Sequence, residues 1–147
     1  MDESTVKNQK HYPGQSLIEF VLVFPILFFL ITGFLDLGRA VFYYSSLSNA
    51  VREGTRYTIV HKGLDEDAIK NKVLEYAFAL KDTPNPLVAD DIIFPPVDDP
   101  NTISIQATYT FKPITPGLTK LFVQLFGNAS GIDLVAQSTM RISGVYR

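Results

Sequence analysis

The chain has 147 residues, with 13 basic and 15 acidic side chains, a net charge of −2 and no cysteine. This length leaves room for one small domain. The charges are spread evenly, so there is no basic stripe of the kind that binds nucleic acid. The lack of cysteine excludes disulfides, thiolate metal sites and cysteine nucleophiles.

An apolar run from Leu17 to Leu35 is the first long feature, and its one charged residue is Glu19. Its nineteen residues span about 28 Å as a helix, close to the hydrocarbon core of about 30 Å, which predicts one transmembrane helix. A cleaved secretory signal is the alternative, but the run exceeds the usual ~7–15 residues and no A-x-A site follows. Basic residues lie on both sides of the run, so charge alone leaves its orientation open.

Two features mark the interior of this run. Pro25 removes one backbone hydrogen bond and predicts a kink or local loosening of the helix. Phe20, Phe24 and Phe28 recur every four residues and form one aromatic stripe. This stripe can face either lipid or sister helices in an assembly.

Helical spacing of apolar or small residues continues beyond the run, at Leu37, Val41, Tyr44, Ser48 and Val51. We therefore expect the first helix to extend to about Val60.

Charged residues three apart follow on this helix: Asp36 with Arg39, and Glu53 with Arg56. Each pair can form on the helix surface and support the helix locally. A functional alternative is that Arg52 and Arg56 bridge to the head or to another subunit. Gly54 costs helix propensity and indicates the close approach of another element.

The remainder of the chain predicts a small head with one helix and an antiparallel sheet. Gly63 suits a turn, and residues 65–81 suit a second helix with Ile69, Val73, Tyr76 and Leu80 on its apolar face. The prolines after Ile92 and Ile93 allow only a short or edge strand there. Alternation predicts a strand over residues 102–112, with Ile103, Ile105, Ala107, Tyr109 and Phe111 on one side. A closing strand is expected over residues 132–143, with Leu134, Ala136, Met140 and Ile142 available to the core, after a short helix or hairpin arm over 117–127.

No constellation of residues points to catalysis, a cofactor or a resident metal. His61 stands alone near a helix end, where solvation or capping is the expected role rather than that of a catalytic base. Asp90, Asp91, Asp98 and Asp99 flank a proline-rich loop and could gather a calcium ion, but they lack an EF-hand pattern and suit solvated turns better. The residues "NAS" from Asn128 fit a glycosylation sequon. We expect a chain that is not an enzyme.

Three short motifs resemble one bacterial family. In "GQSLIEF" Gly14 stands five residues before Glu19, which resembles the processing site of type IV prepilins; the Flp branch has tyrosine where this chain has Phe20. "DLGR" (Asp36, Leu37, Gly38 and Arg39) and "NAVREGTRY" (including Asn49, Arg52, Glu53, Gly54, Arg56 and Tyr57) look like signatures of TadE-like proteins. These are minor pilins or pseudopilins of the tight-adherence (Tad/Flp) pilus system, and the resemblance is specific from Gly14 to about Val60.

The resemblance implies a layout and a set of partners. Residues 1–14 would be a leader, 15–37 the transmembrane part of the first helix, and 38–147 an α+β, pilin-like head outside the cytoplasmic membrane, with the N-terminus in the cytoplasm. A prepilin peptidase would cut after Gly14 and leave Gln15 first. Glu19 would then face the amino terminus of a neighbouring subunit, as it is thought to do in such pilins. The expected partners are that peptidase, other pilin or pseudopilin subunits, the inner-membrane assembly platform and membrane lipid, with no nucleic acid and no cofactor.

Two other functions stay open at this point. A pseudopilin of a type II-like secretion system would share the leader chemistry but would require other partners. A membrane-tethered binding domain would keep its leader and never assemble.

Overall fold

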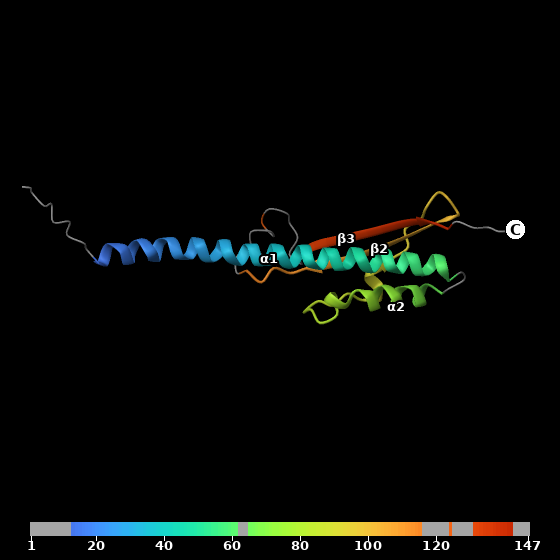
Figure 1. Ribbon diagram of the computed structural model, residues 1–147, viewed down its shortest axis with the longest axis horizontal. Coiled ribbons are helices and arrows are strands. Elements are labelled where there is room, and N and C mark those ends of the chain that lie inside the picture. Colours follow the sequence, from blue (N-terminus) through green and yellow to red (C-terminus); the bar gives the residue numbers. More distant parts are fainter. Residues whose placement is uncertain (1–12, 62–64, 116–123, 125–130, 143–147) are drawn as a thin grey trace, which may run out of the picture.

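A computed structural model describes residues 13–61, 65–115, 124 and 131–142. Its dominant element is the helix α1, Pro13–Val60, 48 residues long and therefore about 70 Å from end to end. Pro25 lies inside α1 without ending it. The predicted extension of the first helix to Val60 is confirmed. The N-terminal half of α1 projects away from the head, and the C-terminal half forms part of it (Figure 1).

The head contains an antiparallel sheet in the order β1-β2-β3, built from β1 (Ile92–Ile93), β2 (Thr102–Phe111) and β3 (Ile132–Arg141). β2 and β3 pair over their whole length, from Thr102 opposite Arg141 to Phe111 opposite Ile132. β1 has two residues and lies at the sheet edge, as the prolines after it require. The predicted α+β layout of a long apolar helix, a second helix and an antiparallel sheet is confirmed.

The second helix, α2 (Glu66–Tyr76), is shorter than the predicted range of 65–81. After Ala77 the chain forms a 3-10 turn, η1 (Phe78–Leu80), and Leu87 then donates its N–H to the carbonyl of Leu80. This turn places Ala77, Leu80 and Leu87 in the core. A helix continued to residue 81 would not bring the chain back in this way, so burial of these side chains decides where α2 ends.

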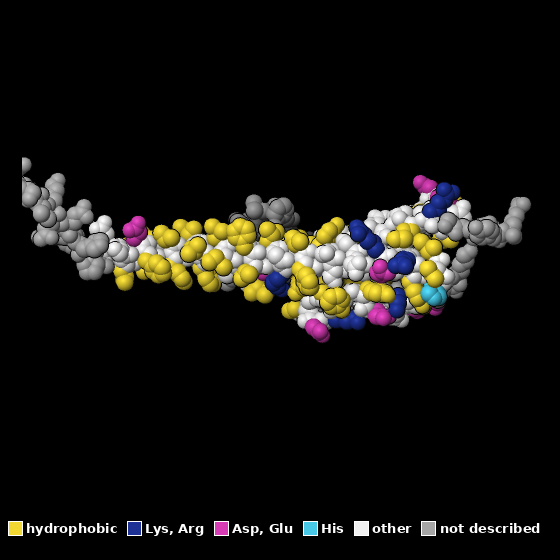
Figure 2. Space-filling model, in the orientation of Figure 1, with side chains coloured by type: hydrophobic (Ala, Val, Ile, Leu, Met, Phe, Trp, Pro, Cys, Tyr) yellow, Lys and Arg dark blue, Asp and Glu magenta, His cyan; other side chains and the backbone are white. Residues whose placement is uncertain are grey.

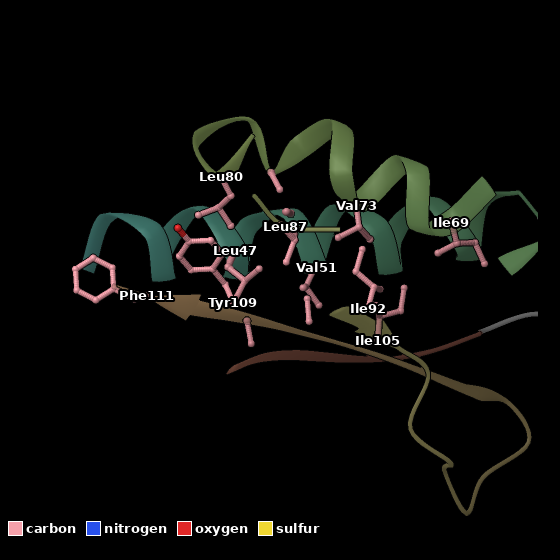
Figure 3. Close-up of a cluster of buried hydrophobic side chains, with 14 residues drawn as sticks. Leu47, Val51, Ile69, Val73, Leu80, Leu87, Ile92, Ile105, Tyr109 and Phe111 are labelled. Carbon is pink, nitrogen blue, oxygen red and sulfur yellow. The ribbon is translucent and has the colours of Figure 1, made fainter. Parts of the chain in front are cut away.

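The core lies where α1 meets α2 on one side and the sheet on the other (Figure 3). Its largest fully buried side chains include Leu47 and Val51 of α1, Val73 of α2, and Ile105 and Phe111 of β2. The predicted alternation of β2 is confirmed, with Ile103 only partly buried. In the second helix Ile69, Val73 and Leu80 are buried as predicted, but Tyr76 is exposed.

The face of α1 that packs in the head is not the stripe that predicted the length of the helix. Leu37, Val41 and Tyr44 are exposed, and of the five stripe positions Val51 alone is fully buried. The core face is offset around the helix and contains Leu47, Ala50 and Thr55 instead. The turn at Gly63, the element over 117–127 and the sequon at Asn128 fall outside the described residues.

Candidate functional site

The N-terminal half of α1 exposes its apolar side chains on all sides. Between Leu17 and Leu35 the large hydrophobic side chains are 48–69% exposed, and hydrophobic atoms cover this part of the molecule (Figure 2). The length and composition of α1 allow it to cross a membrane once. Apolar surface of this extent is stable only against lipid or against other protein.

The three residues of the predicted processing motif lie in the first two turns of this helix. Gly14, Gln15 and Glu19 are all exposed. A Cβ atom added at Gly14 would meet nothing within 4 Å. Packing among the described residues therefore does not require a glycine at this position.

Phe20, Phe24 and Phe28 do form one aromatic stripe along α1. The ring centroids of Phe20 and Phe24 lie 5.5 Å apart, and those of Phe24 and Phe28 lie 6.3 Å apart. All three rings are at least 48% exposed, so they are available to lipid or to a neighbouring helix.

Asp36 lies at the junction between the exposed half and the head, and it is buried. Its carboxylate accepts hydrogen bonds from the N–H of Ile114 at 3.1 Å, the N–H of Thr115 at 2.8 Å and the hydroxyl of Thr115. Arg39 donates to the same carboxylate at 2.9 Å. This carboxylate thus fastens the segment after β2 to α1.

Arg39 extends the junction through aromatic contacts. Its guanidinium lies 5.6 Å from the ring centroid of Tyr43 and 5.4 Å from that of Phe111, and the Tyr43 ring contacts the Tyr109 and Phe111 rings. Burial alone would lower the pKa of Arg39, but the interactions with Tyr43 and Asp36 outweigh it and raise the pKa above its usual value. The group stays charged and adds cation–π attraction to the ion pair.

The predicted pairing of Asp36 with Arg39 is confirmed, but the sequence did not reveal that Asp36 also binds the head. The available signal was an acidic residue directly after an apolar run, where an unpaired carboxylate is costly. The partners come from Ile114 and Thr115, nearly eighty residues later in the chain. Only the fold brings them together.

The second signature segment covers both buried and exposed positions. Gly54 is buried, and a Cβ atom built there would overlap Cγ2 of Val73, so the predicted close approach of another element is confirmed. On the helix surface, a guanidinium nitrogen of Arg56 lies 4.0 Å from a carboxylate oxygen of Glu53. Asn49 and Arg52 are exposed, and Arg52 forms no ion pair with any described residue.

Tyr57 and Gly38 complete the signature positions. The ring of Tyr57 lies 4.3 Å from that of His61, and the amine of Lys72 lies 5.4 Å from the centre of the Tyr57 ring. A ring nitrogen of His61 is 3.2 Å from the carbonyl oxygen of Tyr57, a local contact at the end of the helix. Gly38 is exposed and has open space around it.

The acidic loop residues do not converge. Asp91 accepts from the N–H of Val88 at 3.0 Å, and Asp99 accepts from the N–H of Asn101 at 2.9 Å, an interaction that lowers the pKa of Asp99. Within the described ranges no group of three or more His, Asp or Glu side chains is arranged to hold a metal ion. The geometry fits turn-forming roles for Asp91 and Asp99.

Comparison with protein families gives one match. A family model described as TadE-like protein matches residues 14–56. No curated protein and no solved structure matches the chain. The matched segment starts at Gly14, contains the whole exposed half of α1 and ends at Arg56 in the second signature. The resemblance predicted from the sequence is thereby confirmed over residues 14–56, a segment that includes the part of α1 able to cross a membrane.

Proposed function

We propose that the protein is a minor pilin or pseudopilin of a Tad/Flp-type pilus and is not an enzyme. One observation carries the proposal: the TadE-like segment includes an apolar helix that is exposed on all sides and continues without a break into the core of the head. Such a helix can hold the subunit in a membrane and pack against other subunits through the same surface.

The proposed processing site is the bond between Gly14 and Gln15. Exposure of both residues and the open space around Gly14 support this, because a peptidase at the membrane face needs access to an unencumbered backbone. Cleavage removes residues 1–14 and leaves Glu19 as the fifth residue of the mature chain. In this proposal the N-terminus faces the cytoplasm, the head lies outside the cytoplasmic membrane, and an inner-membrane platform receives the processed subunit.

Glu19 is the proposed assembly residue. A carboxylate within an apolar span costs roughly 3 kcal/mol at a helix centre and less near an end, so its presence calls for a partner. Cleavage creates that partner, because the new α-amino group of Gln15 has a pKa of about 8 and is mostly protonated at neutral pH. The amine of one subunit can then neutralise Glu19 of the next.

The test is the mass of the protein recovered from membranes of cells with an active prepilin peptidase. We expect a mature chain that begins at Gln15, with its amino terminus free, methylated or cyclised. The Gly14→Leu variant should stay full length, and Gly38→Leu, at an equally open glycine on the same helix, should be cut normally. Recovery of only full-length unaltered protein would refute processing and favour an unprocessed tethered domain.

A further inference from the structure

An open groove of about 550 Å³ lies beside the exposed face of α1, above the predicted span. Val41, Phe42 and Tyr44 of α1 and Phe78 of η1 line it. These four side chains are 48–67% exposed. Three neighbouring aromatic rings in solvent are costly for a small head, so the groove has the character of a contact surface.

The charge that lines the groove is positive only, among the described residues. Arg52 and Asn49 lie at its edge, and no carboxylate is among the described residues that line it. Arg52 is exposed and has no ion pair with a described residue, whereas Arg56, one turn later, lies near Glu53. The hydroxyl of Ser46 is buried beside the groove and has no hydrogen-bond partner among the described residues. The groove therefore fits an apolar segment that carries a carboxylate.

The same chain displays such a segment, residues 88–98, around the edge strand β1. Val88, Ile93 and Val97 are 38–49% exposed there, and the segment contains no Lys or Arg. Asp91 is bonded locally, but Asp90 and Asp98 are exposed and make no hydrogen bond or ion pair with a described residue. The segment thus offers exposed apolar side chains and carboxylates, the two features that would complement the groove.

We infer that the groove binds residues 88–98 of a second copy of this chain, with Arg52 facing Asp90 or Asp98. This inference rests on the proposed function, because it assumes subunits held parallel in one membrane. The groove and the segment are different surfaces, so the contact is heterologous. Each pair of copies therefore keeps one unoccupied groove and one unoccupied segment. Repetition of the contact builds a row rather than a closed dimer.

The positions of the two surfaces define the arrangement of the row. Val41 and Tyr44 flank Tyr43, which contacts Tyr109 and Phe111 at the C-terminal end of β2. Residues 94–98 lead toward the other end of β2, at Thr102, which is the end of the head away from the exposed half of α1 (Figure 1). The groove also continues along α1 to Arg52, and Val51 shares the core with Ile92 of β1, which pairs with the middle of β2. The two surfaces therefore overlap along the axis of α1, and two parallel copies in one membrane can make the contact.

The test uses full-length copies with two different tags, expressed together in one membrane and purified through one tag in mild detergent. The Arg52→Glu change in both copies should lower recovery of the second tag about tenfold, since like charges then face each other. The Asp90→Arg/Asp98→Arg double change in both copies should do the same. A mixture of the Arg52→Glu copy with the double-changed copy should recover co-purification, because both contacts between unlike copies are then complementary. The acidic groove of one copy faces the basic segment of the other, and the unaltered Arg52 faces the unaltered aspartates.

Arg56→Glu is the matched control, because it reverses an exposed arginine on the same helix outside the groove, and it should leave recovery unchanged. Circular dichroism of each variant should show the helix content of the unaltered chain. The inference is overturned if unaltered copies do not co-purify, if Arg56→Glu acts as strongly as Arg52→Glu, or if the mixed pair stays apart. Recovery of a different pilin-like subunit in place of the second copy would also overturn it. The mass of the same material reports cleavage at Gly14 separately, so a failure of self-association leaves the proposed function standing.

Discussion

Glu19 and Asp36 are two carboxylates on one helix with different surroundings. Asp36 is buried and accepts hydrogen bonds from the backbone of Ile114 and Thr115, so its cost of desolvation is offset within the chain. Glu19 is exposed on an apolar helix and has no such partner among the described residues. At the scale of single residues, Asp36 acts within the subunit, and Glu19 remains available for a contact between subunits.

We predict that Glu19→Gln blocks assembly without affecting membrane insertion. The exchange keeps shape and hydrogen-bonding capacity but removes the charge, so insertion should be unchanged or improved. The amine of a neighbour's Gln15 would lose its counter-charge, which costs about 3–5 kcal/mol when buried. Co-purification with the pilus machinery should fall, while cleavage after Gly14 should persist. A variant that is cut, inserted and assembled normally would show that Glu19 is only an interfacial residue.

We predict that Asp36→Ala opens the junction between α1 and the segment after β2. The N–H groups of Ile114 and Thr115 would lose their acceptor, which costs about 1–3 kcal/mol. Hydrogen exchange of the Thr115 amide should become faster, by about tenfold or more. Asp36→Asn keeps one acceptor oxygen, so exchange of the Thr115 amide in this variant should be faster than in the unaltered chain and slower than in Asp36→Ala. Unchanged protection of Thr115 in the alanine variant would mean that the junction is held by other contacts.

At the scale of elements, α1 performs two tasks along one continuous helix. Its N-terminal half is exposed and apolar, and its C-terminal half packs against α2 and the sheet. Gly54 allows this packing, because it lets α2 approach until Val73 occupies the space of a Cβ atom. The distance between the two helices therefore depends on the absence of one methyl group.

We predict that Gly54→Ala destabilises the head although alanine is the better helix former. The gain in helix propensity is about 1 kcal/mol, whereas overpacking against the buried Val73 costs about 1–3 kcal/mol. Thermal unfolding of the full chain in detergent should show a lower midpoint. Gly38→Ala, at an open position, should instead raise or preserve the midpoint.

Val73→Ala in the background of Gly54→Ala separates the two effects. It removes the clashing Cγ2 methyl group, so the double variant should be more stable than the sum of the two single changes predicts. Strictly additive changes in the unfolding free energy would show that the helices are not coupled at this point.

At the scale of the whole molecule, the head has its own core, and none of the core side chains among the described residues comes from the exposed half of α1. We predict that a shortened chain beginning at Gly38 folds as a soluble domain with a cooperative unfolding transition. A chain beginning at Gly33 keeps Asp36 and should be more stable by about 1–3 kcal/mol, from the hydrogen bonds at the junction. Urea unfolding followed by circular dichroism measures both. Aggregation of both shortened chains would show that the head needs the complete helix or a neighbouring subunit.

The sequence by itself determined the features that depend on local pattern. The end of α1, the apolar span, the restriction to a short or edge strand before the prolines and the alternation of β2 follow from spacing and from the limits that proline places on a strand. Gly54 indicated a close approach because a glycine inside a helix is costly without one. The TadE-like signatures were equally visible, since they are short runs of adjacent residues.

Only the tertiary structure decided the features that depend on residues distant in the chain. The end of α2 follows from the return of Leu80 and Leu87 to the core, and the burial of Asp36 follows from the arrival of Thr115. The face of α1 that packs on the sheet could not be chosen from periodicity alone, because Leu37, Val41 and Tyr44 are as apolar as the residues that became buried. Their exposure leaves α1 with apolar surface that neither the sheet nor α2 covers.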